Sequence, residues 1–179
     1  MVREHVGMIT FAEFESQSPL LAGRIRDRLQ TTGLGLLGTL RADGSPRISP
    51  IEVSFQDGRL YVGMMPDSCK ARDVRRDPRC ALLTPVADKD DLSGEGKLFA
   101  VAVEVTDRAE AAARLAAAVD ATDVDPEAFG DSPMFELCVT GAAWQHVEGD
   151  AFKTSSWNEA DGARERERVG PAGSVVEVV

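Results

Sequence analysis

Histidine is nearly absent from this sequence of 179 residues, and cysteine is scarce. The two histidines, His5 and His146, are too few for a His-rich metal site, and a Ser-His-Asp triad would have to use one of them. No Gly-x-Ser-x-Gly motif is present. Cys69, Cys80 and Cys138 form no Cys-x-x-Cys pair, and their odd number predicts a reducing compartment without a disulfide framework. We therefore expect neither a metal centre nor a serine hydrolase.

Long apolar runs and an excess of positive charge are missing as well. No stretch approaches the length of a membrane span and no apolar signal core begins the sequence, so we expect a soluble, cytoplasmic protein. The formal net charge of −10 argues against general nucleic-acid binding. Aromatic residues make up only 6% of the chain, but 43% of it is hydrophobic, so alanine and valine can fill the core of one domain.

Helical signals occur in a few places. Thr10 and Ser18 are suited to cap two short helices within the first 32 residues, and a third helix is expected from Ser68 to Arg76. Asp107, with a glutamate three residues later, predicts the start of an alanine-rich helix.

Much of the remaining chain has the pattern of strands joined by tight turns. Asp43-Gly44 and Asp57-Gly58 each separate two apolar runs, which is the signal of a three-stranded antiparallel meander, and Gly149-Asp150 marks another hairpin. With about seven strands and few crossover helices, the pattern favours a mostly β antiparallel barrel or sandwich with helices at its ends.

The middle strand of the meander has two distinct faces. Arg47, Ser49 and Ile51 share one face, and the residues between them share the other. Pro50 has no N–H for a sheet ladder, so we expect either an edge position, with backbone groups free to bind something else, or a simple bulge.

Positive charge gathers just after this meander, although the chain as a whole is acidic. At the start of the expected helix, Ser68 and Lys70 could form a phosphate site with Arg47 from the neighbouring strand, or Ser68 could be an ordinary N-cap. The basic residues that follow are expected on a solvated helix face, where Asp73 and Asp77 can pair with them. They are Arg72, Arg75, Arg76 and Arg79.

The order of these elements resembles one known family. A strand ending in Asp-Gly is followed by Arg-x-x-Pro, then Gly-Arg-Leu-Tyr-Val, then Ser-x-Lys and Asp-Pro-Arg. Over residues 33–83 this order resembles the pyridoxamine 5′-phosphate oxidase-like, flavin-binding split β-barrel family, and most closely its actinobacterial branch of flavin- and deazaflavin-dependent reductases. A weaker resemblance extends to Trp157.

The resemblance implies an antiparallel split β-barrel of about six or seven strands with peripheral helices. The whole chain, residues 1–179, would form a single domain. Its N-terminal helices would lie in residues 1–32, the barrel in 33–158, and a last strand and tail in 159–179.

The resemblance also implies a site for FMN, or alternatively a deazaflavin, in a groove shared by two subunits of a homodimer. Arg47, Ser68 and Lys70 match residues that hold the cofactor phosphate. Two strand segments would line the ring system of the cofactor: Ser49, Pro50 and Ile51 on one strand, and Val62, Gly63 and Met64 on the next. Trp157 resembles an aromatic residue that reaches the cofactor from the second subunit, with Arg164, Arg166 or Arg168 as a basic companion.

The sequence departs from the family pattern at Cys69, which stands where the pyridoxamine phosphate oxidases have an arginine between the serine and the lysine. The Arg-x-His-Asp-Arg pattern of those enzymes is also absent, so pyridoxamine phosphate is not the expected substrate. The resemblance implies an oxidoreductase in which the cofactor carries a hydride to or from an unidentified small molecule, with no catalytic side chain. The alternatives are a non-catalytic protein that stores or senses a flavin, deazaflavin or haem-type ligand, and a dimeric interaction protein without a cofactor.

Overall fold

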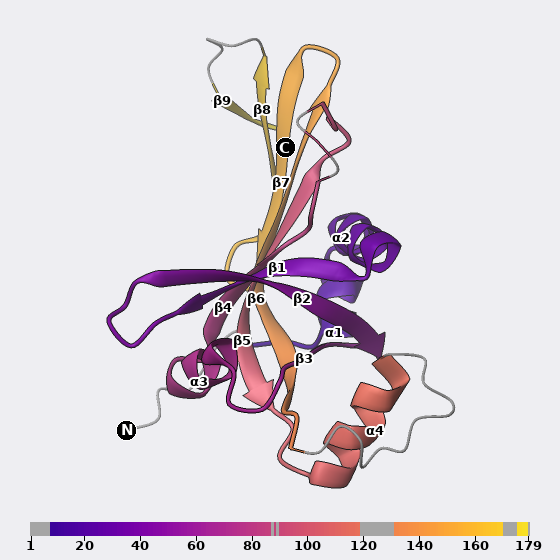
Figure 1. The fold of residues 1–179 in the computed structure, drawn as a ribbon. Coiled ribbons are helices and arrows are strands. Elements are labelled where there is room, and N and C mark those ends of the chain that lie inside the picture. Colours follow the sequence, from indigo (N-terminus) through magenta and orange to yellow (C-terminus); the bar gives the residue numbers. More distant parts are fainter. Residues whose placement is uncertain (1–7, 87, 89, 119–130, 170–174, 179) are drawn as a thin grey trace.

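The computed structural model describes residues 8–86, 88, 90–118, 131–169 and 175–178 (Figure 1). Four helices lie in these ranges: α1 (Phe11–Gln17), α2 (Pro19–Thr32), α3 (Cys69–Arg76) and α4 (Arg108–Ala118). The strands described are β1 (Leu34–Leu40), β2 (Pro46–Gln56), β3 (Arg59–Gly63), β4 (Arg79–Leu83), β5 (Glu95–Glu104), β6 (Met134–Glu148), β7 (Ala151–Asn158), β8 (Gly162–Val169) and β9 (Val175–Val178). No helix in these ranges has the length and apolar character needed to cross a membrane.

The strands form one antiparallel sheet in the order β3-β2-β1-β4-β5-β6-β7-β8-β9. A further pairing between β3 and β6 closes the first six strands into a barrel. Beyond the barrel, the end of β6 continues into β7, β8 and β9, which project as an arm (Figure 1). The expected mostly β, antiparallel split barrel with peripheral helices is therefore confirmed.

Local turn and cap chemistry sets the limits of several elements. Asp57 and Gly58 both have positive φ, 50° and 73°, as a two-residue hairpin turn requires. Thr10 forms a capping box with Glu13 at the start of α1. The hairpins expected at residues 43–44, 57–58 and 149–150 are confirmed by the pairing of the strands on either side.

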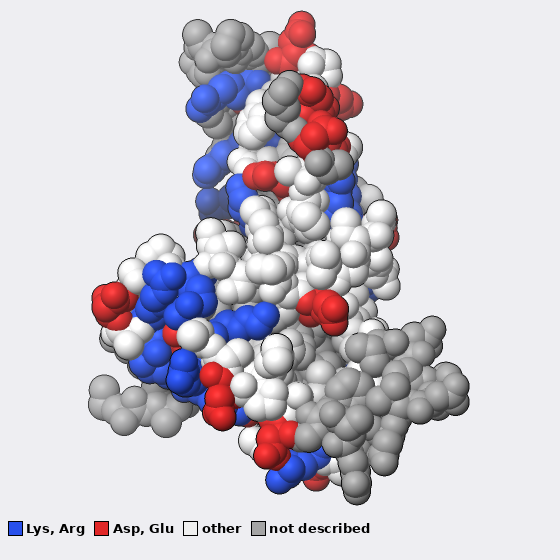
Figure 2. Space-filling view, viewed as in Figure 1, with Lys and Arg blue, Asp and Glu red and all other residues white. Residues whose placement is uncertain are grey.

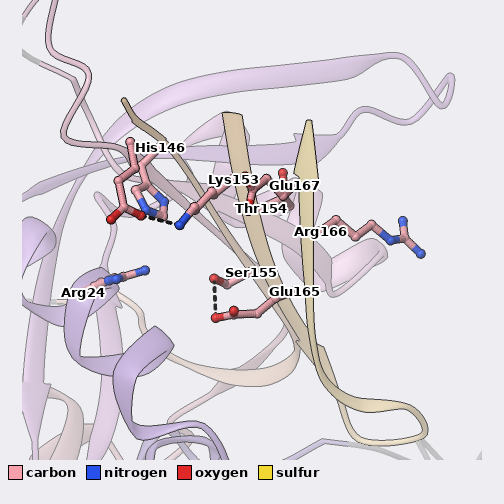
Figure 3. Close-up of a pocket in the computed structure, with 9 residues that line it drawn as sticks. Arg24, His146, Lys153, Thr154, Ser155, Glu165, Arg166 and Glu167 are labelled. Atoms are coloured by element: carbon pink, nitrogen blue, oxygen red, sulfur yellow. Dashed lines mark hydrogen bonds and ion pairs between the residues drawn. The ribbon is translucent and has the colours of Figure 1, made fainter. Parts of the chain in front are cut away.

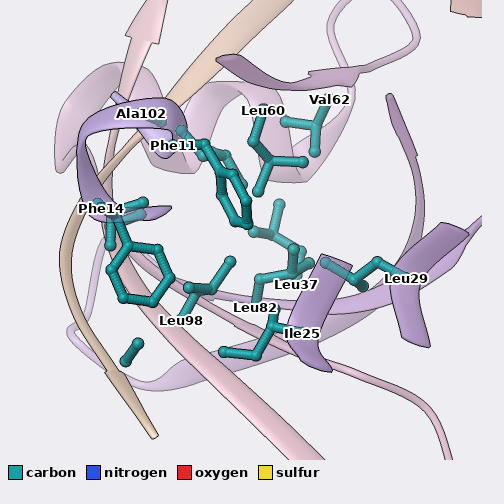
Figure 4. Packing of buried hydrophobic residues seen from close by; sticks show 14 of the residues in the cluster. Phe11, Phe14, Ile25, Leu29, Leu37, Leu60, Val62, Leu82, Leu98 and Ala102 are labelled. Carbon is teal, nitrogen blue, oxygen red and sulfur yellow. The ribbon is translucent and has the colours of Figure 1, made fainter. Parts of the chain in front are cut away.

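The main core lies between the barrel and the two N-terminal helices, which pack on its side (Figures 1 and 4). Phe11 and Phe14 of α1 are fully buried, and their rings meet edge to face with centroids 5.6 Å apart. Ile25 and Leu29 of α2 are buried on the same side, against Leu37 of β1. Truncating one such phenylalanine to alanine costs about 3–5 kcal/mol, so these contacts hold the helices firmly on the barrel.

The C-terminal region contains two strands where the sequence indicated one. β9 pairs with β8, although residues 170–174 of the expected tail lie outside the described ranges. Strand alternation sorts the charges of β8 by face. Arg164, Arg166 and Arg168 point to one side of the arm, and Glu165 and Glu167 point to the other.

Candidate cofactor-binding site

Part of β2 forms a free sheet edge. Its residues 46–52 pair with β1, whereas β3 pairs only with residues 53–56. Pro50 lies opposite Leu36 in an uninterrupted register, so the edge position expected from proline is confirmed and the alternative of a bulge is wrong. Apart from the Pro50 carbonyl oxygen, which accepts a hydrogen bond from Lys70, backbone groups on the open side of this segment have no partner in the described residues and could bind a ligand or another chain.

The two expected faces of β2 are confirmed by burial. Ile48, Pro50 and Glu52 are exposed, while Arg47 and Ser49 are half-buried and Ile51 is buried in the core. Ile51 can therefore offer only its backbone to a ligand.

The start of α3 lies beside this free edge. The Lys70 ammonium donates to the carbonyl oxygen of Pro50 at 3.1 Å, and burial lowers the pKa of Lys70. Ser68 caps the helix, since its hydroxyl accepts from the amide N–H of Ala71 at 3.3 Å. The amide N–H groups of Cys69 and Lys70 have no hydrogen-bond partner in the described part of the chain. The structure thus brings Ser68, Lys70 and Pro50 together.

Arg47 joins the same region through a buried carboxylate. Its Nε donates to Oδ2 of Asp73 at 2.6 Å, and the Thr39 hydroxyl donates to the same oxygen at 2.9 Å. Nη2 of Arg76 lies 3.3 Å from the other oxygen. Burial by itself would raise the pKa of Asp73, but the hydrogen bonds from Arg47, Thr39 and Arg76 outweigh it and lower the pKa.

The expected pairing of Asp73 with an arginine of the helix is confirmed at Arg76, but its expected setting needs correction. The residue is not on a solvated helix face, because only 3% of it is exposed and its partners come from β1 and β2. Arg79 is also misplaced in the sequence-based expectation, since α3 ends at Arg76 and Arg79 begins β4. Sequence reasoning missed both Asp73 and Thr39 as members of the site.

The other arginines of the basic stretch are exposed, as expected. Arg75 pairs with Glu104 of β5, and Arg79 pairs with Asp77 at 2.6 Å. These exposed pairs contribute little to stability. Figure 2 shows Lys and Arg side chains gathered over α3 and the β1–β2 hairpin, on the left of the view.

Cys69 is exposed beside Arg72. Nη2 of Arg72 donates to its Sγ at 3.4 Å. This hydrogen bond, together with the charges of Arg47 and Arg72, lowers the pKa of the Cys69 thiol. An anion at the first turn of α3 would meet the same positive potential.

The side chains of Val62 and Met64, expected beside the cofactor ring, are buried in the core. Val62 lies opposite Val53 of β2 and Phe135 of β6, and Met64 directly follows β3. A Cβ atom at Gly63 would lie 2.5 Å from a methyl carbon of Leu115. These three residues can therefore offer a ligand mainly backbone atoms, and their expected place beside the cofactor ring stays a prediction.

Trp157 is also buried. Only 3% of it is exposed, and its ring packs on Phe14 of the same chain at a centroid distance of 4.9 Å. In the single chain the ring is buried in the protein's own core, so the structure does not direct it towards a second subunit, and its contact with a partner's cofactor stays a prediction. The exposed arginines of β8 lie on the other face of the strand pair from Trp157.

A separate pocket of about 230 Å³ lies between α2 and the arm (Figure 3). Arg24 points towards it from α2, and His146, Lys153 and Glu165 line it from three strands. Nδ1 of His146 is buried without a hydrogen-bond partner in the described ranges, and burial, then the charge of Arg24, lowers the pKa of this histidine. No motif indicated this pocket, because strand pairing and the packing of α2 bring together residues that are far apart in the sequence.

Comparisons with known proteins agree with this architecture. A sequence profile of the family described as Pyridoxamine 5′-phosphate oxidase matches residues 21–148. No curated protein matches the sequence. Among solved structures, PhzG from Burkholderia lata 383, in complex with tetrahydrophenazine-1-carboxylic acid, has a TM-score of 0.62 at 13% identity, over 89% of this chain and 95% of that one.

Two further solved structures share the fold. One is a protein from Clostridium acetobutylicum, related to general stress protein 26 of the pyridoxinephosphate oxidase family, with a TM-score of 0.58, 11% identity, and 80% and 96% of the two chains covered. The other is a haem-binding protein from Mycobacterium smegmatis, with a TM-score of 0.50, 16% identity, and 85% and 89% covered. Because the family profile spans more than half of the sequence, this chain belongs to the pyridoxamine 5′-phosphate oxidase family.

Proposed function

We propose that this protein is an oxidoreductase that binds FMN, or alternatively a deazaflavin, with the cofactor phosphate at the first turn of α3. The observation that carries the proposal is the contact between Lys70 and Pro50, which joins the helix start to the free edge of β2. Family membership supports it, because Arg47, Ser68 and Lys70 match the family's phosphate-binding residues. Membership of the family's actinobacterial branch of flavin- and deazaflavin-dependent reductases remains a prediction.

The donors present suit a phosphate group. The amide groups of Cys69 and Lys70 have no partner in the described chain and lie at the positive end of a helix dipole. Lys70 and Arg47 add two positive charges, and Arg47 has a planar fork suited to phosphate oxygens. Cys69, in place of the family's arginine, removes one cation, so the phosphate would be held less tightly than in the pyridoxamine phosphate oxidases.

A bound flavin or deazaflavin would supply hydride transfer through its ring system. The chain's own residues would bind and orient it: the first turn of α3 would hold the phosphate, and the free backbone groups of residues 46–52 would face the ring. No side chain of the site needs to act as an acid or base, and the substrate is an unidentified small molecule.

A homodimer is part of the proposal, because one sheet face is apolar and partly exposed. Ile48, Gly38, Ala81 and Phe99 lie opposite one another across four strands, and cross-strand partners share a face. Ile48 is 74% exposed and Phe99 is 49% exposed. Figure 2 shows a broad uncharged area between the arm and the basic residues near α3. A second copy of the chain would cover such a face.

The arm supports the same arrangement. Lys97 of β5 pairs with Ala143 of β6, Ala143 pairs with Ser156 of β7, and Ser156 pairs with Arg164 of β8. Lys97 and Phe99 are two residues apart on β5 and share a face, so the arginines of β8 lie on the same face of the sheet as Phe99. A partner seated on the apolar face would meet Arg164 and Arg168. These residues are the proposed basic companions of the partner's cofactor.

The second candidate function is a protein that holds a flavin, deazaflavin or haem-type ligand without turnover. The haem-binding protein from Mycobacterium smegmatis has the same fold, and the site residues would serve either role. Reduction of the bound cofactor by NADH or NADPH, followed by reoxidation by an acceptor, separates the two functions.

Lys70→Ala tests the proposed site. FMN titrations of this variant should give a Kd about tenfold above that of the unmodified protein, because one charge-assisted phosphate contact is lost. Lys153→Ala is the matched control, since Lys153 pairs with Glu148 on the arm. Equal FMN affinity in all three proteins would contradict the site.

A further inference from the structure

We infer that Asp73 is a positioning residue that aims the guanidinium of Arg47 at the cofactor phosphate. The inference rests on the proposed function and assigns a role to a residue outside the family's phosphate-binding motif. It makes Asp73 responsible for discrimination between phosphorylated and unphosphorylated ligands.

The contacts of Arg47 leave the two terminal nitrogens of its guanidinium free in the described part of the chain. Only its Nε is held by Asp73, at 2.6 Å, and its two terminal nitrogens have no partner in the described part of the chain. An arginine held through Nε keeps both terminal N–H groups on one side for an anion. The guanidinium is therefore fixed at one end and open at the other.

The carboxylate that fixes Arg47 is itself rigidly held. Thr39 lies directly opposite Arg47 in the β1–β2 register, and both side chains converge on the same oxygen of Asp73. Arg76 approaches the second oxygen and also donates to the carbonyl oxygen of Leu40. With partners on two strands and its own helix, Asp73 has little freedom to move.

Asp73 holds Arg47 against the side of α3 that also carries Cys69 of the first turn. Cys69 is four residues before Asp73, so the two residues lie on the same side of α3. The charge of Arg47 acts on Cys69, which is consistent with a guanidinium that lies along this side. A phosphate above the amides of Cys69 and Lys70 would meet the terminal nitrogens of Arg47.

A carboxylate near an anion site needs this explanation. A negative charge close to a phosphate repels it and weakens binding, and burying that charge costs further free energy. Asp73 can offset this cost by orienting the guanidinium of Arg47, because it lies between Arg47 and Arg76 and holds Arg47 in place. If Asp73 only sequestered Arg47, removing its charge would strengthen FMN binding.

The test compares FMN with riboflavin, which has the same ring but no phosphate. Fluorescence titrations would give both Kd values for the unmodified protein, Asp73→Asn, Arg47→Ala and the double variant. We expect Asp73→Asn to raise the FMN Kd about tenfold and to leave the riboflavin Kd unchanged. In the Arg47→Ala background, Asp73→Asn should have no further effect on FMN, since it acts through Arg47.

Three results would overturn the inference: tighter FMN binding by Asp73→Asn, equal losses for FMN and riboflavin, or fully additive losses in the double variant. Asp77→Asn is the control, because in the described residues the hydrogen bonds of the Asp77 carboxylate all come from the exposed Arg79, from its side chain and its backbone N–H. If Asp73→Asn does not fold, Arg47→Lys provides the test, since lysine keeps the charge but lacks the planar guanidinium that can bind Asp73 and a phosphate at the same time. The Arg47→Lys protein should lose affinity for FMN but not for riboflavin, and an unchanged FMN Kd would contradict the positioning role of Asp73.

The same titrations separate this inference from the proposed function. An unmodified protein that binds neither FMN nor a deazaflavin removes the proposed function and the inference with it. An unmodified protein that binds FMN, with an Asp73→Asn variant of unchanged preference for FMN over riboflavin, removes the inference alone.

Discussion

The Nζ atom of Lys70 lies 3.1 Å from the carbonyl oxygen of Pro50, which ties the first turn of α3 to the free edge of β2. This contact satisfies one backbone acceptor on an edge that β3 leaves open. It also holds a cation next to helix amides that have no partner in the described chain. The candidate site is therefore assembled by the folded chain itself.

Ile48→Glu should prevent dimerisation. The side chain is exposed in the single chain but would be covered by a partner, and burying an unpaired carboxylate costs several kcal/mol. We expect the dimer Kd to rise by about a hundredfold or more, and the FMN affinity to fall with it. Light scattering at several concentrations gives the mass. Leu20→Glu, an exposed apolar position on α2, is the control, and a monomeric unmodified protein with full FMN affinity would refute the shared site.

Cys69 should be the most readily alkylated of the three cysteines. A hydrogen bond from Arg72 and the charges of Arg47 and Arg72 lower its pKa, whereas burial raises the pKa of Cys80 to about 12 and that of Cys138 to about 11. Iodoacetamide labelling read by mass spectrometry should modify Cys69 from a lower pH than an ordinary thiol. Arg72→Ala should move this profile to higher pH, and comparable labelling of Cys80 in the folded protein would be incompatible with the structure.

Trp157→Phe should leave cofactor binding unchanged. The indole is buried against Phe14 in its own chain, so the substitution acts on the core and not on the site. Trp157→Ala should lower the free energy of unfolding by about 3–5 kcal/mol, and the phenylalanine variant by less. Urea unfolding and FMN titration of the same samples check both statements. A selective loss of FMN affinity in a stable Trp157→Phe protein would indicate that Trp157 contacts the cofactor.

Asp73 should make stability depend on acid pH. Its pKa in the folded protein is lowered by its hydrogen bonds, so its contribution is complete above the unfolded value of about 3.9 and is lost as the pH falls through the folded value. The stability advantage of the unmodified protein over Asp73→Asn should therefore shrink as the pH falls below about 4. Urea unfolding from pH 7 downwards measures it. An advantage that stays constant or grows in acid would show that the carboxylate is not held in this way.

Local chemistry made much of the fold predictable. The Asp-Gly turns require positive φ, and the structure has it at Asp57 and Gly58, so the hairpins could be placed from neighbouring residues alone. The edge at Pro50 followed from its missing N–H. The helix start at Ser68 followed from the preference for a hydroxyl at the N-cap.

Features that depend on distant partners could not be read from the sequence. Asp73 is surrounded by charged residues in sequence, which is typical of a solvated helix, yet it binds Thr39 and Arg47, which are 34 and 26 residues away. Trp157 carries no local signal that distinguishes a core position from an exposed one. Such outcomes are decided by tertiary packing, which a pattern along one strand or helix does not contain.

The most direct test of the proposed site is an absorbance titration of the purified protein with FMN and, separately, with a deazaflavin. We predict a saturable shift of the cofactor spectrum with one cofactor per chain, and weaker binding of riboflavin because it lacks the phosphate. If neither phosphorylated cofactor changes its spectrum at high micromolar protein concentration, the assignment of a flavin-type site to Arg47, Ser68 and Lys70 is wrong.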